Sequence, residues 1–96
     1  MIKRSDLLSI NFYKKSAFTG SDKNLRFRIS KDTIDDTDVL SACVFPGPYA
    51  FDSTDESLKT YKVFEFSDKG LDEIVEWFNS DEISEKIMSL LHKKNN

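Results

Sequence analysis

The chain has few of the residue types on which most catalytic and metal sites depend. Its 96 residues include one cysteine, Cys43, and one histidine, His92. A single cysteine excludes an intramolecular disulfide framework and a cysteine-based zinc site. His92 falls in the last turn of a predicted helix, so it gives little support to a Ser-His or Cys-His nucleophilic centre. We therefore expect a protein that is not an enzyme, with no catalytic residues, no metal ligands and no cofactor.

Glycine, proline and long apolar runs are also scarce, and each shortage excludes a class of protein. Three glycines and two prolines exclude collagen-like and low-complexity chains, while 39% hydrophobic residues argue against disorder. No apolar run approaches the ~18–20 residues that span a bilayer, and residues 1–9 lack the apolar core of a signal peptide. We expect a cytoplasmic protein with no membrane partner, in which Cys43 is a buried thiol.

Charge is distributed unevenly along a chain whose net charge is −3. Residues 1–31 contain eight Lys or Arg and two acids, whereas residues 32–58 contain seven acids and no Lys or Arg. One interpretation is a basic surface directed at an anionic partner and an acidic surface directed elsewhere. The other is that the two parts lie side by side and neutralise each other, because charges within about 10 Å interact at physiological salt.

Alternating apolar and polar residues in the first two thirds of the chain are typical of strands. The alternation is clearest where Leu25, Phe27 and Ile29 share one face and two arginines share the other. Turn residues at 18–22 and an acidic connection at 32–38 separate the apolar segments. The pattern predicts four strands, at residues 10–13, 25–29, 39–45 and 61–66.

The last third of the chain has the 3.6-residue periodicity of two amphipathic helices. Apolar residues recur at helical spacing from Leu71 to Phe78, after Ser67, which can cap the first helix. Asn79 and Glu82 stand at capping-box spacing before a second apolar stripe. The sequence therefore predicts a helix on each side of residue 80.

These elements predict the fold class. A run of strands followed by helices is typical of an α+β domain. We expect an antiparallel four-stranded meander followed by two C-terminal helices that pack on one face of the sheet. A chain of 96 residues allows one domain, residues 1–96, with a lead-in at 1–9 and a frayed tail at 93–96.

Seven short sequence strings stand along the chain in an order and spacing that are similar to those of a protein family. They are YKK at 13–15, FTGS at 18–21, RFRI at 26–29, PGPY at 46–49, FEFS at 64–67, GL at 70–71 and WFN at 77–79. Over most of residues 10–79 the chain resembles a family of short, uncharacterised bacterial proteins. The resemblance implies a single cytoplasmic domain and no particular activity.

Candidate partner-binding residues lie first in a loop and on a helix. Pro48 and Tyr49 belong to a proline-stiffened loop, which would present an aromatic ring with little loss of entropy on binding. The alternative is that the loop aromatics fold back and close the end of the sheet. Trp77 flanks the apolar stripe of the first helix, either as the rim of the core or as an anchor for a partner.

A second candidate is the acidic connection, in which Asp35, Asp36 and Asp38 are clustered. Because the glycine and the terminal glutamate of an EF-hand are missing, we expect no calcium site. These aspartates form either a solvated loop or part of a surface that mimics a phosphate backbone.

A different class of function is suggested by basic and aromatic residues on the predicted strands. Tyr13, Lys15, Arg26 and Arg28 would project from one face of the sheet, where they could stack bases and contact phosphates. The alternative is a solvated or protein-binding face. The net negative charge of the chain opposes nucleic-acid binding at long range.

The favoured interpretation is a small non-enzymatic domain that binds another protein, as an adaptor or inhibitor. An inhibitor encoded by a phage or mobile element and acting on a host protein is one concrete version, based on size and charge alone. The second interpretation is a nucleic-acid or nucleotide binder that uses the basic and aromatic face. An exposed edge strand leaves a homodimer open.

Overall fold

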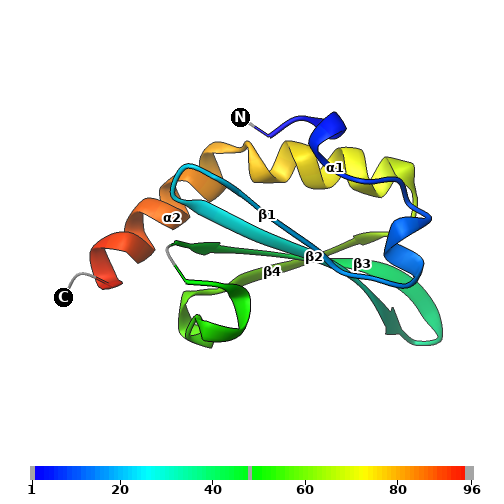
Figure 1. The fold of residues 1–96 in the computed structure, drawn as a ribbon, viewed down its shortest axis with the longest axis horizontal. Coiled ribbons are helices and arrows are strands. Elements are labelled where there is room, and N and C mark those ends of the chain that lie inside the picture. The colour runs from blue at the N-terminus through cyan, green and yellow to red at the C-terminus, as the bar shows by residue number, and fades with distance from the viewer. Residues whose placement is uncertain (1, 48, 95–96) are drawn as a thin grey trace.

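The computed structural model describes residues 2–47 and 49–94, and the side chains up to residue 91. The strands form one antiparallel sheet in the order β1-β2-β3-β4, followed by two helices, as the sequence predicts. Figure 1 shows both helices across one face of this sheet. Residues 95 and 96 of the predicted frayed tail lie outside the described residues. The bounds are β1 Phe18–Asp22, β2 Leu25–Ile34, β3 Thr37–Pro46, β4 Thr60–Glu65, α1 Asp68–Phe78 and α2 Asp81–Lys94.

The position of the first strand is wrong in the sequence prediction. Residues 10–13 do not form a strand, since Phe12–Lys14 is a short 3-10 helix, and β1 occupies the segment predicted as a turn. The inward side of β1 has almost no apolar signal because Gly20 stands at its centre. The ring of Phe27 on β2 fills that space, with its Cζ atom 2.5 Å from where a Cβ of residue 20 would lie. A neighbouring strand thus supplies the apolar group that β1 lacks.

The acidic connection predicted at 32–38 is mostly strand. β2 continues to Ile34, β3 starts at Thr37, and the two strands pair without interruption from Leu25 opposite Pro46 to Ile34 opposite Thr37. Only Asp35 and Asp36 form the turn, with φ values of 51° and 64°. Two successive positive φ angles characterise a tight turn whose twist matches that of the strands, and aspartate tolerates this conformation better than most residues.

The core lies between the sheet and the two helices. Side chains from the helix-facing side of the sheet, including Phe27, Ile29, Leu40 and Val44, are at most 3% exposed. They pack in one cluster with apolar side chains of both helices and of the N-terminal segment: Ile2, Leu7, Tyr13, Leu71, Ile74, Trp77, Phe78, Ile83 and Ile87. Two apolar side chains of the predicted lead-in, Ile2 and Leu7, are therefore buried in this core.

The helix starts follow the predicted chemistry at α1 but not at α2. The Ser67 hydroxyl accepts a hydrogen bond from the N–H of Gly70 (3.1 Å), as expected of a cap. The predicted cap of α2, Asn79, instead pairs with the backbone of Ile2, accepting at 3.0 Å and donating at 2.7 Å. Ser80 takes over the start of α2, where its hydroxyl accepts from the N–H of Ile83 (3.4 Å).

Gly70 permits the close approach of α1 to the end of β4, and its substitution tests this packing. A Cβ at residue 70 would lie 1.8 Å from the carbonyl oxygen of Glu65, which is backbone and cannot move aside. We expect Gly70→Ala to lower the free energy of unfolding by about 2 kcal/mol or more, although alanine is normally favoured in helices. Urea denaturation followed by circular dichroism measures this change.

Gly47→Ala is the matched control. A Cβ at residue 47 would meet only the flexible side chain of Arg26, with Nε at 3.2 Å. We expect a change below about 1 kcal/mol for this variant. Equal losses for the two variants would show that the contact between residue 70 and the backbone of Glu65 is not the cause.

Candidate interaction surface

The sheet has a second face, here called the outer face, which points away from the two helices. Because side chains alternate along a strand, the register of the four strands fixes which residues share this face. In β2 and β3 it carries two arginines at one end and small or aliphatic residues at the other. Its residues are Thr19, Ser21, Arg26, Arg28, Ser30, Asp32, Ile34, Thr37, Val39, Ser41, Cys43, Phe45, Tyr61, Val63 and Glu65.

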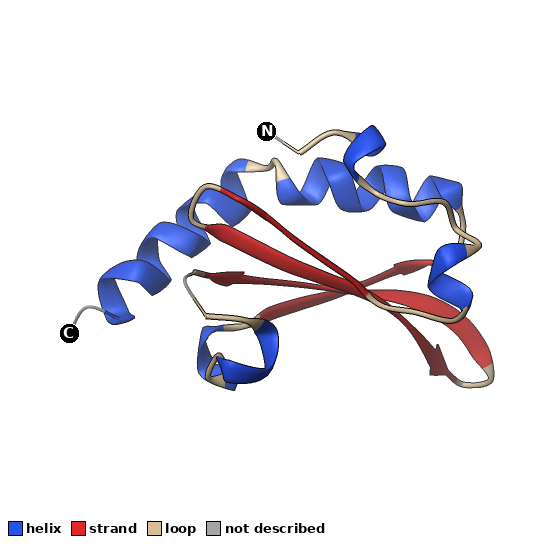
Figure 2. Cartoon of the chain, viewed as in Figure 1, coloured by secondary structure: helices blue, strands red, loops and turns tan. Residues whose placement is uncertain are grey.

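One end of the outer face is covered by residues 49–59, here called the covering segment. The segment contains two short 3-10 helices, Phe51–Ser53 and Glu56–Leu58, which Figure 2 shows on the side of the sheet opposite α1 and α2. The ring of Phe51 lies against that of Phe45 on β3, with centroids 5.9 Å apart. Of the two alternatives for this loop, its phenylalanine therefore follows the second, because Phe51 folds back onto the sheet.

Two cations hold the ring of Phe51 in place. The guanidinium carbon of Arg28 lies 4.7 Å from the ring centroid, and the Nζ atom of Lys59 lies 3.8 Å from it. Cation–π contacts of this kind contribute about 0.5–2 kcal/mol each, with the larger value where the cation is desolvated. The side chain of Lys59 is only 4% exposed, so its contact belongs to the desolvated class.

Glu56 joins the covering segment to the edge strand β4. Its carboxylate accepts hydrogen bonds from Lys59 Nζ (2.9 Å) and from the Tyr61 hydroxyl (3.1 and 3.3 Å). These bonds lower the pKa of Glu56, whereas burial and the bond to Glu56 raise the pKa of Tyr61 to about 12. Because the folded state favours the ionised carboxylate, this connection holds above the ordinary pKa of glutamate and weakens as the pH falls below it.

Cys43 lies beneath this covered end and is 2% exposed. Burial raises the pKa of its thiol to about 11. The thiol therefore stays protonated at neutral pH, and a protonated buried thiol is a poor nucleophile. The expectation of a buried cysteine is confirmed.

The predicted partner-binding residues are spread over the molecule. Tyr49 is 56% exposed at the start of the covering segment, whereas Pro48 lies outside the described residues. Trp77 is 6% exposed on the helix side of the sheet, where its ring packs against Phe64 (centroids 5.7 Å apart) and its indole N–H donates to Glu82 (3.5 Å). Trp77 is thus part of the core and shares no surface with Tyr49.

The three predicted acidic residues lie at the tip of the β2–β3 hairpin. Asp35 and Asp36 are exposed in the turn itself. Asp38 points to the helix side of β3 and forms an ion pair with Lys31 (3.9 Å). Only the turn aspartates therefore extend the outer face, and a role for all three in partner binding stays a prediction.

The predicted nucleic-acid face is not assembled, because two of its four residues do not lie on the sheet. Tyr13 is 1% exposed in the 3-10 helix Phe12–Lys14, and its hydroxyl accepts from the N–H of Leu8 (3.4 Å). Lys15 follows that helix and is exposed there. The prediction that both lie on a strand is wrong. The alternation at residues 10–13 belongs to a segment that packs on the core without joining the sheet. Arg26 and Arg28 do lie together on the outer face.

The covering segment leaves the other end of the outer face uncovered, and this end is here called the open half. It was not among the candidate surfaces that the sequence predicted. Ile34, Tyr61 and Val63 are 45%, 49% and 47% exposed there. The signal was present in the alternation of β4, where Tyr61 and Val63 stand opposite in direction to the buried Phe64. Tyr61 marks the boundary of this open half, because its hydroxyl still bonds the covering segment.

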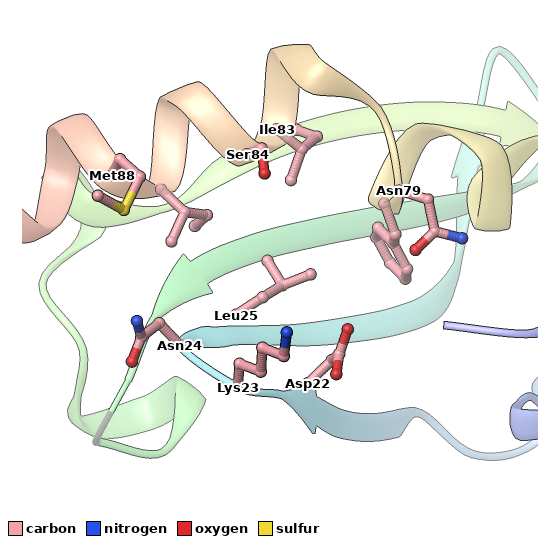
Figure 3. A pocket seen from close by; sticks show the side chains of 10 residues that line it. Asp22, Lys23, Asn24, Leu25, Asn79, Ile83, Ser84 and Met88 are labelled. Atoms are coloured by element: carbon pink, nitrogen blue, oxygen red, sulfur yellow. The ribbon is translucent and has the colours of Figure 1, made fainter. Parts of the chain in front are cut away.

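A separate hollow of about 340 Å³ lies between the β1–β2 turn and α2. Figure 3 shows Lys23 and Asn24 of the turn on one side and Ile83 and Met88 of the helix on the other. Met88 is 55% exposed at this site, which makes it a useful reference for the exposed side chains of the outer face.

Comparison with protein-family models, curated proteins and solved structures finds no match to the chain. Among the described residues, no cluster of three His, Cys, Asp or Glu side chains is placed to hold a metal ion. Within the same residues, neither helix has the length and apolar character needed to cross a membrane.

The reactivity of Cys43 reports whether the covering segment is closed. We expect the thiol of the native protein to react slowly with a water-soluble disulfide reagent at pH 8, since it is buried and protonated. Phe51→Ala removes the ring that anchors the segment and should raise the rate at least tenfold, with the fold retained by circular dichroism. Tyr49→Ala, an aromatic change at an exposed position of the same segment, should leave the rate unchanged. Equal rates for wild type and Phe51→Ala would mean that Phe51 does not hold the segment closed.

Proposed function

We propose that this protein is a small, non-enzymatic binding domain that docks a basic partner protein on the open half of its outer face. It would act as an adaptor or inhibitor in the cytoplasm. The observation that carries the proposal is the group of exposed apolar side chains on this half, Ile34, Tyr61 and Val63, bordered by acidic residues.

The apolar part of this surface is unusual for a sheet face in contact with water. Three large apolar side chains on the same face are each nearly half exposed, and Val39 lies between them at intermediate exposure. Ser30 and Ser41 pair with each other beside Val63. Their small, uncharged side chains leave the centre of the surface without a charge. An apolar, uncharged centre with a polar rim is the usual anatomy of a protein interface.

The rim of the open half determines the chemistry of the partner. Asp32 and Glu65 stand on either side of Val39 in neighbouring strands, and Asp35 and Asp36 form the adjoining turn. Within the outer face, the arginines lie at the opposite, covered end. An acidic rim attracts a basic partner surface and repels another acidic one. A second copy of this chain docked face to face would bring the two acidic rims together, so a basic partner is favoured over a dimer through this face.

The same charges disfavour the nucleic-acid alternative. A phosphate backbone laid across the outer face would meet Asp32 and Glu65 on one half while gaining only Arg26 and Arg28 on the other. With Tyr13 in the core, the face also lacks the predicted stacking ring. Nucleic-acid binding is therefore an outcome for the experiment to exclude.

A matched pair of variants tests the proposal. Val63→Asp places a charge at the centre of the open half, whereas Met88→Asp makes the same change at a comparably exposed residue of α2, remote from that face. Each tagged protein is incubated with nuclease-treated lysate of the host cell, and retained proteins are quantified. We expect a partner that wild type and Met88→Asp retain and that Val63→Asp loses at least tenfold, because a buried unpaired charge is costly at an interface.

Three outcomes would contradict the proposal. Equal retention by Val63→Asp would remove the open half as the docking surface, and loss through Met88→Asp alone would move it to α2. A partner that disappears on nuclease treatment would support the nucleic-acid alternative. Recovery of only a second copy of the chain would indicate self-association in place of a basic partner.

A further inference from the structure

A pocket of about 290 Å³ lies at the covered end of the outer face, between the edge strand β1 and the start of the covering segment. Thr19 and Ser21 of β1 form one wall, and Ala50 and Phe51 form the other. Arg26 and Phe45 belong to the two strands that lie beneath. The volume is near the lower end of the ~300–1,000 Å³ range of ligand pockets, so the pocket suits a small group.

The polar side chains that line this pocket can all donate hydrogen bonds. Arg26 is the only charged lining residue, and Ser21 stands directly opposite it in the register of β1 and β2. Thr19 adds a second hydroxyl on the same side of β1. The lining thus offers one guanidinium and two hydroxyls with no carboxylate beside them. Such a set donates hydrogen bonds and carries positive charge, which are the properties that an oxyanion requires.

Arg26 is a partly buried residue that forms no ion pair within the described residues. Its side chain forms no ion pair or hydrogen bond with another residue in the described part of the chain, although Arg26 is only of intermediate exposure. Arg26 lines the pocket, and its Nε atom lies beside Gly47 at the end of β3. An arginine that loses water without gaining a carboxylate retains its capacity for bidentate binding of an anion.

The surroundings add positive charge to the same end of the sheet. Arg28, two residues along β2, bonds the Ser30 hydroxyl (3.3 Å) and stacks on Phe51, so it too lacks a carboxylate partner within the described chain. The covering segment also carries three acids, Asp52, Asp55 and Glu56, of which Glu56 is engaged by Lys59 and Tyr61. Within the described residues, Arg26 and Arg28 form no ion pair with any of them.

We propose that this pocket binds an oxyanion, a carboxylate or phosphate carried on a small apolar group, with Arg26 as its principal ligand. The hydroxyls of Thr19 and Ser21 would donate to the remaining oxygens, and Phe45, Ala50 and Phe51 would contact the apolar part. The site is at the opposite end of the outer face from the proposed docking surface, so it stands or falls independently of the proposed function.

The two sources of the anion are distinguished by the choice of probe. Benzoate presents a carboxylate and phenyl phosphate presents a phosphate on the same ring, whereas inorganic phosphate and acetate lack the apolar part. Each is titrated into the full-length ¹⁵N-labelled protein, and amide shifts are followed by NMR at constant ionic strength. We expect shifts concentrated on residues 19–21, 26 and 50–51, and at least tenfold tighter binding of one ring-bearing anion than of its counterpart without a ring.

Variants that each remove one positive charge distinguish binding at this pocket from nonspecific attraction of an anion to the protein. Arg26→Gln should weaken binding at least tenfold, whereas Lys15→Gln, the loss of an exposed cation elsewhere, should not change it. Ser21→Ala on the edge strand keeps the charge and should weaken binding severalfold, which protects the test if Arg26→Gln is unstable. Shifts that are absent at 10 mM probe, or equal in wild type and Arg26→Gln, would overturn the proposal.

Discussion

The pairing register of β2 with β3 is the constraint on which the rest of this structure depends. Ten consecutive residue pairs join the two strands, and the turn at Asp35 and Asp36 fixes their alignment. A slip of one residue would turn over the faces of one strand relative to the other. If β3 kept Val44 in the core, Phe27 of β2 would leave the core and a neighbouring arginine would enter it. The cost of burying an arginine there and exposing the core side chains makes one register strongly preferred.

This register also divides the outer face into two unlike halves. At one end the cations Arg28 and Lys59 enclose Phe51, so the covering segment packs on the sheet through a charged and aromatic contact. At the other end Val63 and Ile34 remain half exposed beside acidic residues. On the strands of the outer face, the arginines therefore stand at one end and Asp32 and Glu65 at the other. Which of the two interpretations of the charge distribution holds stays a prediction.

The sequence predicted the class of fold because the strongest patterns, at 25–29 and 71–78, belong to elements that face the core directly. It misplaced the first strand because Gly20 carries no side chain and its space is filled by Phe27, a contact between strands that no local pattern contains. Tyr13 and Trp77 were candidate surface residues, yet both are buried, since segments distant in the chain cover them. The open half depends on how far residues 49–59 extend over the sheet, which only the tertiary structure determines.

The claim that the outer face is half covered and half open is tested most directly by solvent accessibility in solution. NMR relaxation of side-chain protons by a soluble, uncharged paramagnetic agent measures this for each residue at low protein concentration. The account predicts strong relaxation of the Val63 and Ile34 methyl groups, comparable to the methyl of Met88, and little relaxation of the Phe45 ring. Protection of Val63 to the same degree as Phe45 would contradict it, because the outer face would then be closed along its whole length.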